Sequence, residues 1–513
     1  MKNYQFFRKK ENYMWKNLTN LQSTLKISFK NITKKVMLII LVVLTTIQLA
    51  ILVGWIINPW IKQQPFPILI QTETRILRVL TPLSPYLLLT GIYFWLTKPL
   101  NQKIKAFKKL KEKIEKFKTY NLPTKKSALI VLVATILALT LALYPYHPNL
   151  NPDGKPIGVD VKHYVKYLRE IITQPTITQA INQAFTETAE GQRGIHLTIL
   201  YLVALLTETN IVNVAKFQLP FLIIFILLAI YPLTLEGYKN RLYASILTLF
   251  TASSHLLTIG VFAAFYSNLF ALAFCYLYYT FLLKYSTQPS KKIFLAMLLT
   301  STPTIFIHPW TWIMLILGVT FIYLLLQISR KNFSPKIKKK ILPITLILAI
   351  NITIDFVVKS IIFQATTGEI VAYKTLSTGL SLANLENFFT NLFMATRIFA
   401  GGAYSNPLIL TLLILGVFSL NFQKNNYTQL ILAWILAVSL IFPFSNSSIQ
   451  SRLIFNLPLP ILAVEGLFLL GTIIQKNKNS KLKTEVKLLF LLLTLTSFSY
   501  AFRYIINTIP ILT

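Results

Sequence analysis

Long stretches of apolar residues recur along this chain, and they limit its possible folds more than any other feature. A helix of about 20 apolar residues crosses the ~30 Å hydrocarbon core of a bilayer. The chain is 54% hydrophobic and only 13% charged, whereas soluble proteins carry roughly 25% charged residues. Only helices and closed barrels satisfy their backbone in lipid, and stretches of this length suit helices. The sequence therefore predicts an all-α, polytopic membrane protein.

We predict about thirteen transmembrane helices, with boundaries at 36–59, 79–97, 127–146, 213–235, 242–259, 263–284, 293–307, 310–329, 341–361, 404–421, 428–445, 456–474 and 487–509. A further apolar run covers residues 195–208. If this run crossed the membrane, every later loop would lie on the opposite side. The basic stretch "RKNFSPKIKKK" would then be outside, against the positive-inside rule. We therefore interpret residues 195–208 as a re-entrant or interfacial segment.

The distribution of Lys and Arg predicts the orientation. With the N-terminus inside, the cytoplasmic segments hold 37 Lys and Arg residues and the external segments hold 11. Cytoplasmic loops carry such an excess in membrane proteins. The net charge of +35 is thus explained without nucleic acid as a partner. We predict an integral protein of a prokaryotic plasma membrane, with a cytoplasmic N-terminus and an external C-terminus.

The chain divides into two predicted parts. Residues 1–126 comprise a basic N-terminal segment, the first two predicted spans and a basic, cytoplasmic amphipathic helix. Residues 127–513 form the main membrane domain, whose longest external loop covers 147–212. The one cysteine, Cys275, lies inside an apolar run, so no intrachain disulfide can form.

Two of the three aspartates in the chain, Asp153 and Asp160, lie in this external loop. Asp153 belongs to "NPDG", in which all four residues favour tight turns, so it could serve the turn alone. Asp160 precedes a predicted helix of about twelve residues and could serve only as its N-terminal cap. Glu187 and Glu190 are further acids in the same loop, and a solvated surface explains both.

The helix after Asp160 predicts chemistry as well as structure. An acid, an imidazole and two phenols share one face at helical spacing: Asp160, His163, Tyr164 and Tyr167. Three cations form a second face, and four apolar residues form a stripe for packing: Lys162, Lys166 and Arg169, then Val161, Val165, Leu168 and Ile172. Cations can bind a phosphate headgroup. A carboxylate can accept a proton from an attacking hydroxyl or help to bind a divalent cation.

The stretch "GVDVKHYVKYL" is similar to the Gly-x-Asp-x-x-x-Tyr pattern in the first external loop of many integral-membrane glycosyltransferases of the GT-C superfamily. Later stretches resemble these enzymes more loosely: "FYSNLFAL", "FIHPWTW" and "SSIQSRLIFNLPLPILAVEGL". The resemblance covers about residues 127–474, mostly as topology. It implies a GT-C-like fold, with residues 1–126 as an N-terminal addition.

The resemblance also implies a function. These enzymes transfer a sugar from a polyprenyl-phosphate donor to an acceptor on the external face of the membrane, with a loop carboxylate as base and often Mg²⁺ or Mn²⁺. Asp160 matches the loop acid. Asp153 could be the second catalytic or metal-binding acid, although its spacing of seven departs from the adjacent or one-apart pair of the family. Arg452 matches the late external arginine and would bind phosphate.

Other residues are candidate contacts to the sugar or phosphate: His163, Tyr164, Lys166, Arg169 and His308. An interfacial aromatic belt explains "HPWTW" at His308 equally well, and a plain interfacial anchor could explain Arg452. Two other functions remain open: a transporter or flippase of a lipid-linked or anionic substrate, and a non-catalytic membrane subunit. A cavity open to the outer leaflet and external water, with Asp160 on its wall, would favour the enzyme.

Overall fold

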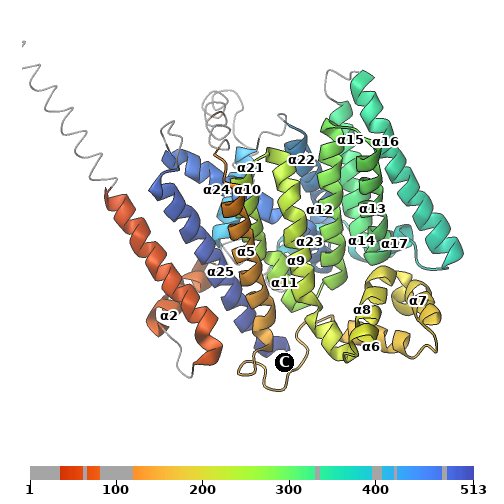
Figure 1. Cartoon of the computed structure of the whole chain (residues 1–513), viewed down its shortest axis with the longest axis horizontal. Coiled ribbons are helices and arrows are strands. Elements are labelled where there is room, and N and C mark those ends of the chain that lie inside the picture. Colours follow the sequence, from red (N-terminus) through yellow and green to blue (C-terminus); the bar gives the residue numbers. More distant parts are fainter. Residues whose placement is uncertain are drawn as a thin grey trace, which may run out of the picture.

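The computed structural model describes residues 35–61, 66–80, 112, 120–329, 335–395, 407–420, 425–475 and 482–512. These residues are almost entirely helical (Figure 1). Within them the only β pairing is an isolated bridge between Leu380 and Ser445. The predicted all-α fold is thus confirmed.

One bundle is formed by Lys35–Trp60, α5 (Thr124–Leu143), α9 (Ile211–Tyr238), α10 (Arg241–Ala252), α11 (His255–Ala263), α12 (Tyr266–Thr287), α13 (Lys291–Ile307), α15 (Thr320–Ile328), α16 (Pro335–Thr353), α21 (Pro407–Ser419), α22 (Asn426–Ser439), α24 (Leu459–Gln475) and α25 (Thr484–Leu512). The segments between them contain further helices: α2 (Pro67–Leu80), α6 (Val161–Ile172), α7 (Ile177–Thr186), α8 (Gly194–Thr207), α14 (Pro309–Thr311), α17 (Gly368–Gly379), α18 (Ala383–Glu386), α19 (Phe388–Met394) and α23 (Ser447–Asn456). Two π-helices, Trp312–Val319 and Ile354–Ile362, continue α14 into α15 and extend α16.

Nine helices in the described part of the chain are long and apolar enough to cross a membrane, or ten if the bent pair α23 and α24 is one span. Two predicted spans correspond to shorter helices: 293–307 to α13, with 17 residues, and 404–421 to α21, with 13. Residues 81–97 of the predicted span 79–97, and most of the predicted amphipathic helix in 98–126, lie outside the described residues. The count of thirteen therefore remains a prediction.

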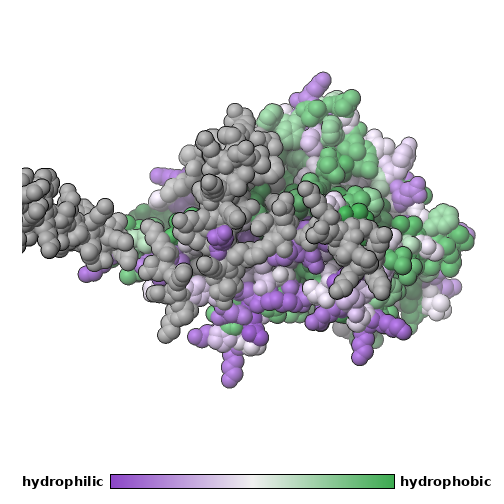
Figure 2. Space-filling model, turned by 90° about the horizontal axis from the view of Figure 1, so that it is seen from above, coloured by the Kyte–Doolittle hydropathy of each residue, from purple (hydrophilic) through white to green (hydrophobic). Residues whose placement is uncertain are grey.

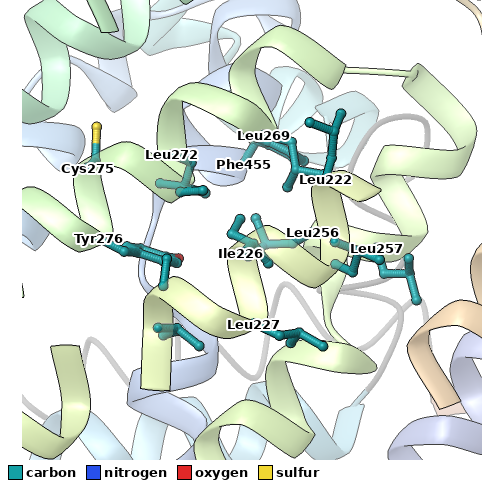
Figure 3. Close-up of a cluster of buried hydrophobic side chains, with 14 of the residues drawn as sticks. Leu222, Ile226, Leu227, Leu256, Leu257, Leu269, Leu272, Cys275, Tyr276 and Phe455 are labelled. Carbon is teal, nitrogen blue, oxygen red and sulfur yellow. The ribbon is translucent and has the colours of Figure 1, made fainter. Parts of the chain in front are cut away.

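Large aliphatic and aromatic side chains hold the centre of the bundle together. Figure 3 shows Leu222 and Ile226 of α9, Leu256 of α11, Leu272 of α12 and Phe455 of α23 meeting in one cluster. A transmembrane helix pairs its backbone groups internally, so backbone hydrogen bonds do not select its neighbours. Side-chain packing of this kind therefore decides which helices meet.

Apolar side chains also cover the outside of the bundle. Leu129, Leu132 and Ile136 of α5 are exposed by more than half, and so is Leu299 of α13. Figure 2 views the molecule from the end opposite α6–α8 and shows hydrophobic residues along much of the right-hand flank. Such a surface is stable against lipid tails, which supports insertion in a membrane.

The first long loop folds into a layer of its own. Helices α6, α7 and α8 lie together at one end of the bundle, close to α14 and α17 (Figure 1). We call this end the loop face. α25 also ends there, so the C-terminus and the loop lie on the same side. The apolar run that we interpreted as re-entrant or interfacial is α8, a helix of 14 residues, which packs against α6 and α7 in this layer.

Helices α21 and α24 approach each other through two glycines, as small residues allow in membrane bundles. A methyl group added to Gly466 would lie 1.9 Å from the backbone oxygen of Leu412, and one added to Gly416 would lie 1.8 Å from that of Leu462. We expect Gly466→Ala to lower thermal stability, since overpacking costs about 1–3 kcal/mol. The control is Gly318→Ala, because the nearest atom there is 3.4 Å away. Equal melting temperatures for the two variants would contradict this contact.

Candidate functional site

A cavity of about 240 Å³ opens among the elements of the loop face. Its walls come from the start of α6, the turn before α8, the first turn of α12, α14, α17 and α23. They are formed by Asp160, Tyr164, Glu190, Gln192, Arg193, Phe265, Ser267, Asn268, His308, Pro309, Trp310, Val371, Lys374, Thr375 and Arg452.

The backbone holds Asp160 at the edge of this cavity. Gly158 has φ +122°, and a methyl group there would lie 2.9 Å from the Cβ of Ala264, so only glycine fits this turn. The next two residues bind the end of α11: the N–H of Val159 donates to Phe262 O (3.0 Å) and that of Asp160 to Ala263 O (3.3 Å). Asp160 thus occupies the N-cap position of α6.

The Asp160 carboxylate makes no capping hydrogen bond to α6, so the simple cap role that the sequence left open is not supported. Burial raises its pKa, and the positive charges of Arg193 and Arg452 act in the opposite direction, as do His163 and Lys162. The carboxylate is therefore half-buried, close to two arginines and without a structural task in its own helix. A side chain in this state is suited to accept a proton.

Helix α6 turns a different face inward from the one that we predicted. Its buried stripe is Val161, Tyr164, Leu168 and Ile171, whereas the predicted stripe included Val165 and Ile172. The prediction was wrong because the Tyr164 ring is buried through hydrogen bonds: its hydroxyl accepts from the N–H of Ser267 (2.9 Å) and lies 3.0 Å from Ser267 Oγ. A buried tyrosine needs such partners, and apolar spacing cannot reveal them.

The other predicted contacts on α6 lie outside the cavity wall. His163 is exposed and stacks on Tyr167, with ring centroids 6.4 Å apart. Lys166 is exposed and lies 3.9 Å from Glu170, and Arg169 is exposed as well. The structure therefore brings Asp160, Tyr164, His308 and Arg452 together, and it does not bring His163, Lys166 or Arg169 to them.

Arg193 lines the cavity although no sequence pattern predicted it. Its guanidinium lies over the ring of Tyr164, 5.2 Å from the centroid, and 5.7 Å from that of Tyr167. Its Nη1 atom is buried without a hydrogen-bond partner in the protein. A buried donor normally has a partner, so this atom can donate to a ligand. The only signal in the sequence is a lone arginine between two glycines in "GQRG".

His308 presents one ring nitrogen to the cavity. Its Nδ1 accepts a hydrogen bond from the N–H of Thr311 (3.3 Å) and lies 2.7 Å from Thr311 Oγ1, which donates to Asn268 Oδ1. This network assigns the proton to Nε2. Burial holds the pKa of His308 well below its usual range, and Arg193 and Arg452 lower it further. The neutral ring can therefore donate from Nε2.

A buried lysine supports the segment that carries His308. Pro309 has no N–H, so the carbonyl of Ile305 loses its helical partner. Lys359 donates to that oxygen from Nζ at 3.1 Å. One turn earlier, Asp355 Oδ2 accepts from the N–H of Gly368 at the start of α17 (2.8 Å). Asp355 and Lys359 both belong to the π-helix Ile354–Ile362, a form often found near functional sites. This π-helix thus links the segment that carries His308 to α17.

Helix α17 and the residues just before it contact the turn that carries Glu190. Glu190 Oε2 lies 3.3 Å from Lys374 Nζ and accepts from Thr366 Oγ1 (3.0 Å). The backbone oxygen of Glu190 also accepts from the N–H of Thr366. The Thr366 hydrogen bond and the Lys374 contact lower the pKa of Glu190. Glu190 is therefore ionised at neutral pH.

The predicted second acid lies elsewhere. Asp153 is exposed in the predicted turn, 3.3 Å from Lys155 Nζ, and it is not among the cavity-lining residues. In the described part of the chain, no three His, Cys, Asp or Glu side chains are grouped as metal ligands. Of the two cavity carboxylates, Glu190 contacts Lys374 and Asp160 faces two arginines. A Mg²⁺ or Mn²⁺ ion at this cavity would have at most these two carboxylates as acidic ligands from its lining, and each of them already lies beside a cation.

Comparison with known proteins adds no assignment: no protein-family model matches this chain, and no curated protein is significantly similar in sequence. The candidate site therefore stands on its own geometry.

Proposed function

We propose that the protein is a membrane glycosyltransferase of the GT-C type, which moves a sugar from a polyprenyl-phosphate donor to an acceptor at the loop face. The observation that carries the proposal is the composition of the cavity. One half-buried carboxylate, Asp160, faces two arginines, and the helices around the cavity have apolar outer surfaces. A lipid-linked phosphate sugar has the matching parts: an anion, a polar ring and a chain that stays in the membrane.

Each wall has a task in this reaction. Arg193 and Arg452 bind the donor phosphate through charge-assisted hydrogen bonds, and the ring of Trp310 and the Nε2–H of His308 contact the sugar. Asp160 takes the proton from the acceptor hydroxyl. The acceptor oxygen then bonds to the anomeric carbon as the bond from that carbon to the phosphate oxygen breaks. The polyprenyl phosphate leaves with the electron pair, and the two arginines stabilise its charge.

Divalent metal ions test one part of this account. The resemblance to GT-C enzymes predicted Mg²⁺ or Mn²⁺, but the arginines already supply positive charge where the phosphate would bind. We expect EDTA to leave sugar transfer by the purified protein unchanged. Loss of transfer in EDTA, with recovery on addition of Mg²⁺ or Mn²⁺, would contradict the assignment of phosphate binding to cationic side chains without a metal ion.

Transport of the same lipid is the main alternative. Ionisable residues near the membrane midplane are typical of transporters, whereas this cavity is built from elements of the loop face. A panel of polyprenyl-phosphate sugars, supplied to membranes that contain the protein, separates the two functions. An enzyme releases free polyprenyl phosphate and transfers the sugar, and a transporter leaves the donor intact.

A further inference from the structure

We propose that Glu190 competes with the anionic headgroup for Lys374, so that ligand binding replaces a carboxylate partner with a phosphate. The inference rests on the proposed function, because it takes the ligand of this cavity to be a phosphate-bearing lipid. It makes Lys374 a third phosphate-binding cation and gives Glu190 a role that opposes binding.

The contact between the two side chains is built to be exchanged. Both residues line the cavity, and their charged groups are 3.3 Å apart with side chains 57% and 62% exposed. Neither group is locked in place by burial. A lysine ammonium is a compact charge on a flexible chain, so Lys374 can turn from Glu190 to another anion in the same cavity.

Glu190, in contrast, is held firmly. Besides its two bonds from Thr366, its Oε2 accepts from Gln192 Nε2 (3.2 Å). Its backbone has φ 54°, and Ala189 before it has φ 52°. Left-handed conformations are unfavourable for residues other than glycine and persist where the surrounding structure holds them in place. The Glu190 carboxylate is therefore bonded at the cavity wall by Thr366 and Gln192 as well as by Lys374.

This arrangement predicts the sign of a charge substitution. A phosphate that enters the cavity is repelled by Glu190 and gains Lys374 only when that ion pair opens. Glu190→Gln removes the repulsion and frees the lysine while retaining hydrogen-bonding groups. We expect about two- to fivefold tighter binding, which is the size of an exposed ion-pair effect. Lys374→Gln, which breaks the same pair from the other side, should weaken binding by a similar factor.

The experiment measures equilibrium binding of farnesyl phosphate to the purified full-length protein in detergent. The matched control is Glu187→Gln, which makes the same charge change three residues away. Glu187 is exposed, bonds to Gln183 and does not line the cavity. Tighter binding by Glu190→Gln but not by Glu187→Gln supports the proposal. Equal effects of the two variants, or weaker binding by Glu190→Gln, would overturn it.

Further arms identify the ligand and the mechanism. Farnesol and inorganic phosphate distinguish the lipid from the phosphate, and the gain in Glu190→Gln should be seen only with ligands that carry phosphate. In a Lys374→Gln background the gain should shrink, and a gain of full size there would overturn competition for Lys374. If the wild-type protein binds farnesyl phosphate and Glu190→Gln binds it no more tightly, the competition for Lys374 is refuted and the proposed function is not. If neither protein binds the ligand, the proposed function is overturned as well.

Discussion

Asp160→Asn is expected to reduce sugar transfer about 10²–10⁴-fold, the usual contribution of a general base, without loss of the fold. The amide keeps the size and polarity of the side chain but cannot accept the proton. The carboxylate makes no capping bond to α6, so its replacement removes no interaction that holds the helix. The rate of transfer from a lipid donor, measured beside a melting curve, tests both statements.

Asp153→Asn is the matched control, since Asp153 lies in the same loop but outside the cavity. We expect it to retain full activity. The pH profile adds a second readout. Burial raises the pKa of Asp160, so its carboxylate takes up a proton at a higher pH than an ordinary aspartate, whose pKa is ~3.9. As the pH decreases, activity should therefore begin to fall before this ordinary value is reached. A fully active Asp160→Asn protein would end the assignment of this residue as the base.

Arg452→Ala and Arg193→Ala are each expected to weaken donor binding about ten- to a hundredfold. A hydrogen bond to a charged group contributes roughly 1.5–3 kcal/mol, and ~1.4 kcal/mol corresponds to a factor of ten in affinity. Both guanidinium groups line the cavity near Asp160, and Arg193 has a buried donor without a protein partner. Titration with a polyprenyl-phosphate ligand measures the loss.

Arg169→Ala provides the control for charge. Arg169 is an exposed cation of the same loop, on α6, and it does not line the cavity. We expect its loss to leave donor affinity unchanged. If Arg169→Ala weakens binding as much as Arg452→Ala does, binding depends on the general positive charge of the loop face and not on the cavity.

The membrane spans could be predicted because lipid imposes a simple demand on sequence. A helix must be long and apolar to cross, and the predicted span 213–235 lies within α9, Ile211–Tyr238. The apolar helix α8 was not counted as a span, because a crossing there would place the basic loop that follows α15 on the external side. Asp160 and Arg452 could be predicted as site residues because acids, and cations in the segments predicted to be external, are rare, and because both residues match positions in the GT-C resemblance.

Other parts of the site depend on contacts that no local pattern records. Tyr164 is buried because Ser267, far along the chain, supplies its hydrogen-bond partners. Arg193 enters the cavity through a strained turn at Ala189 and Glu190, which precedes α8 without a recognisable motif. Lys374 was not predicted as a cavity residue, because no motif around it distinguishes it from the other lysines of the chain. These residues needed the three-dimensional arrangement of α6, α12 and α17.

The central claim is that the cavity breaks the bond between a sugar and a lipid phosphate. The most direct test uses a polyprenyl-phosphate donor with one isotope in the sugar and another in the lipid, added to membranes with wild-type or Asp160→Asn protein. We predict that the sugar label separates from the lipid label with the wild type and stays with it in the variant. Two labels that remain together with the wild type across the whole donor panel, or that separate equally well in the variant, would contradict the account.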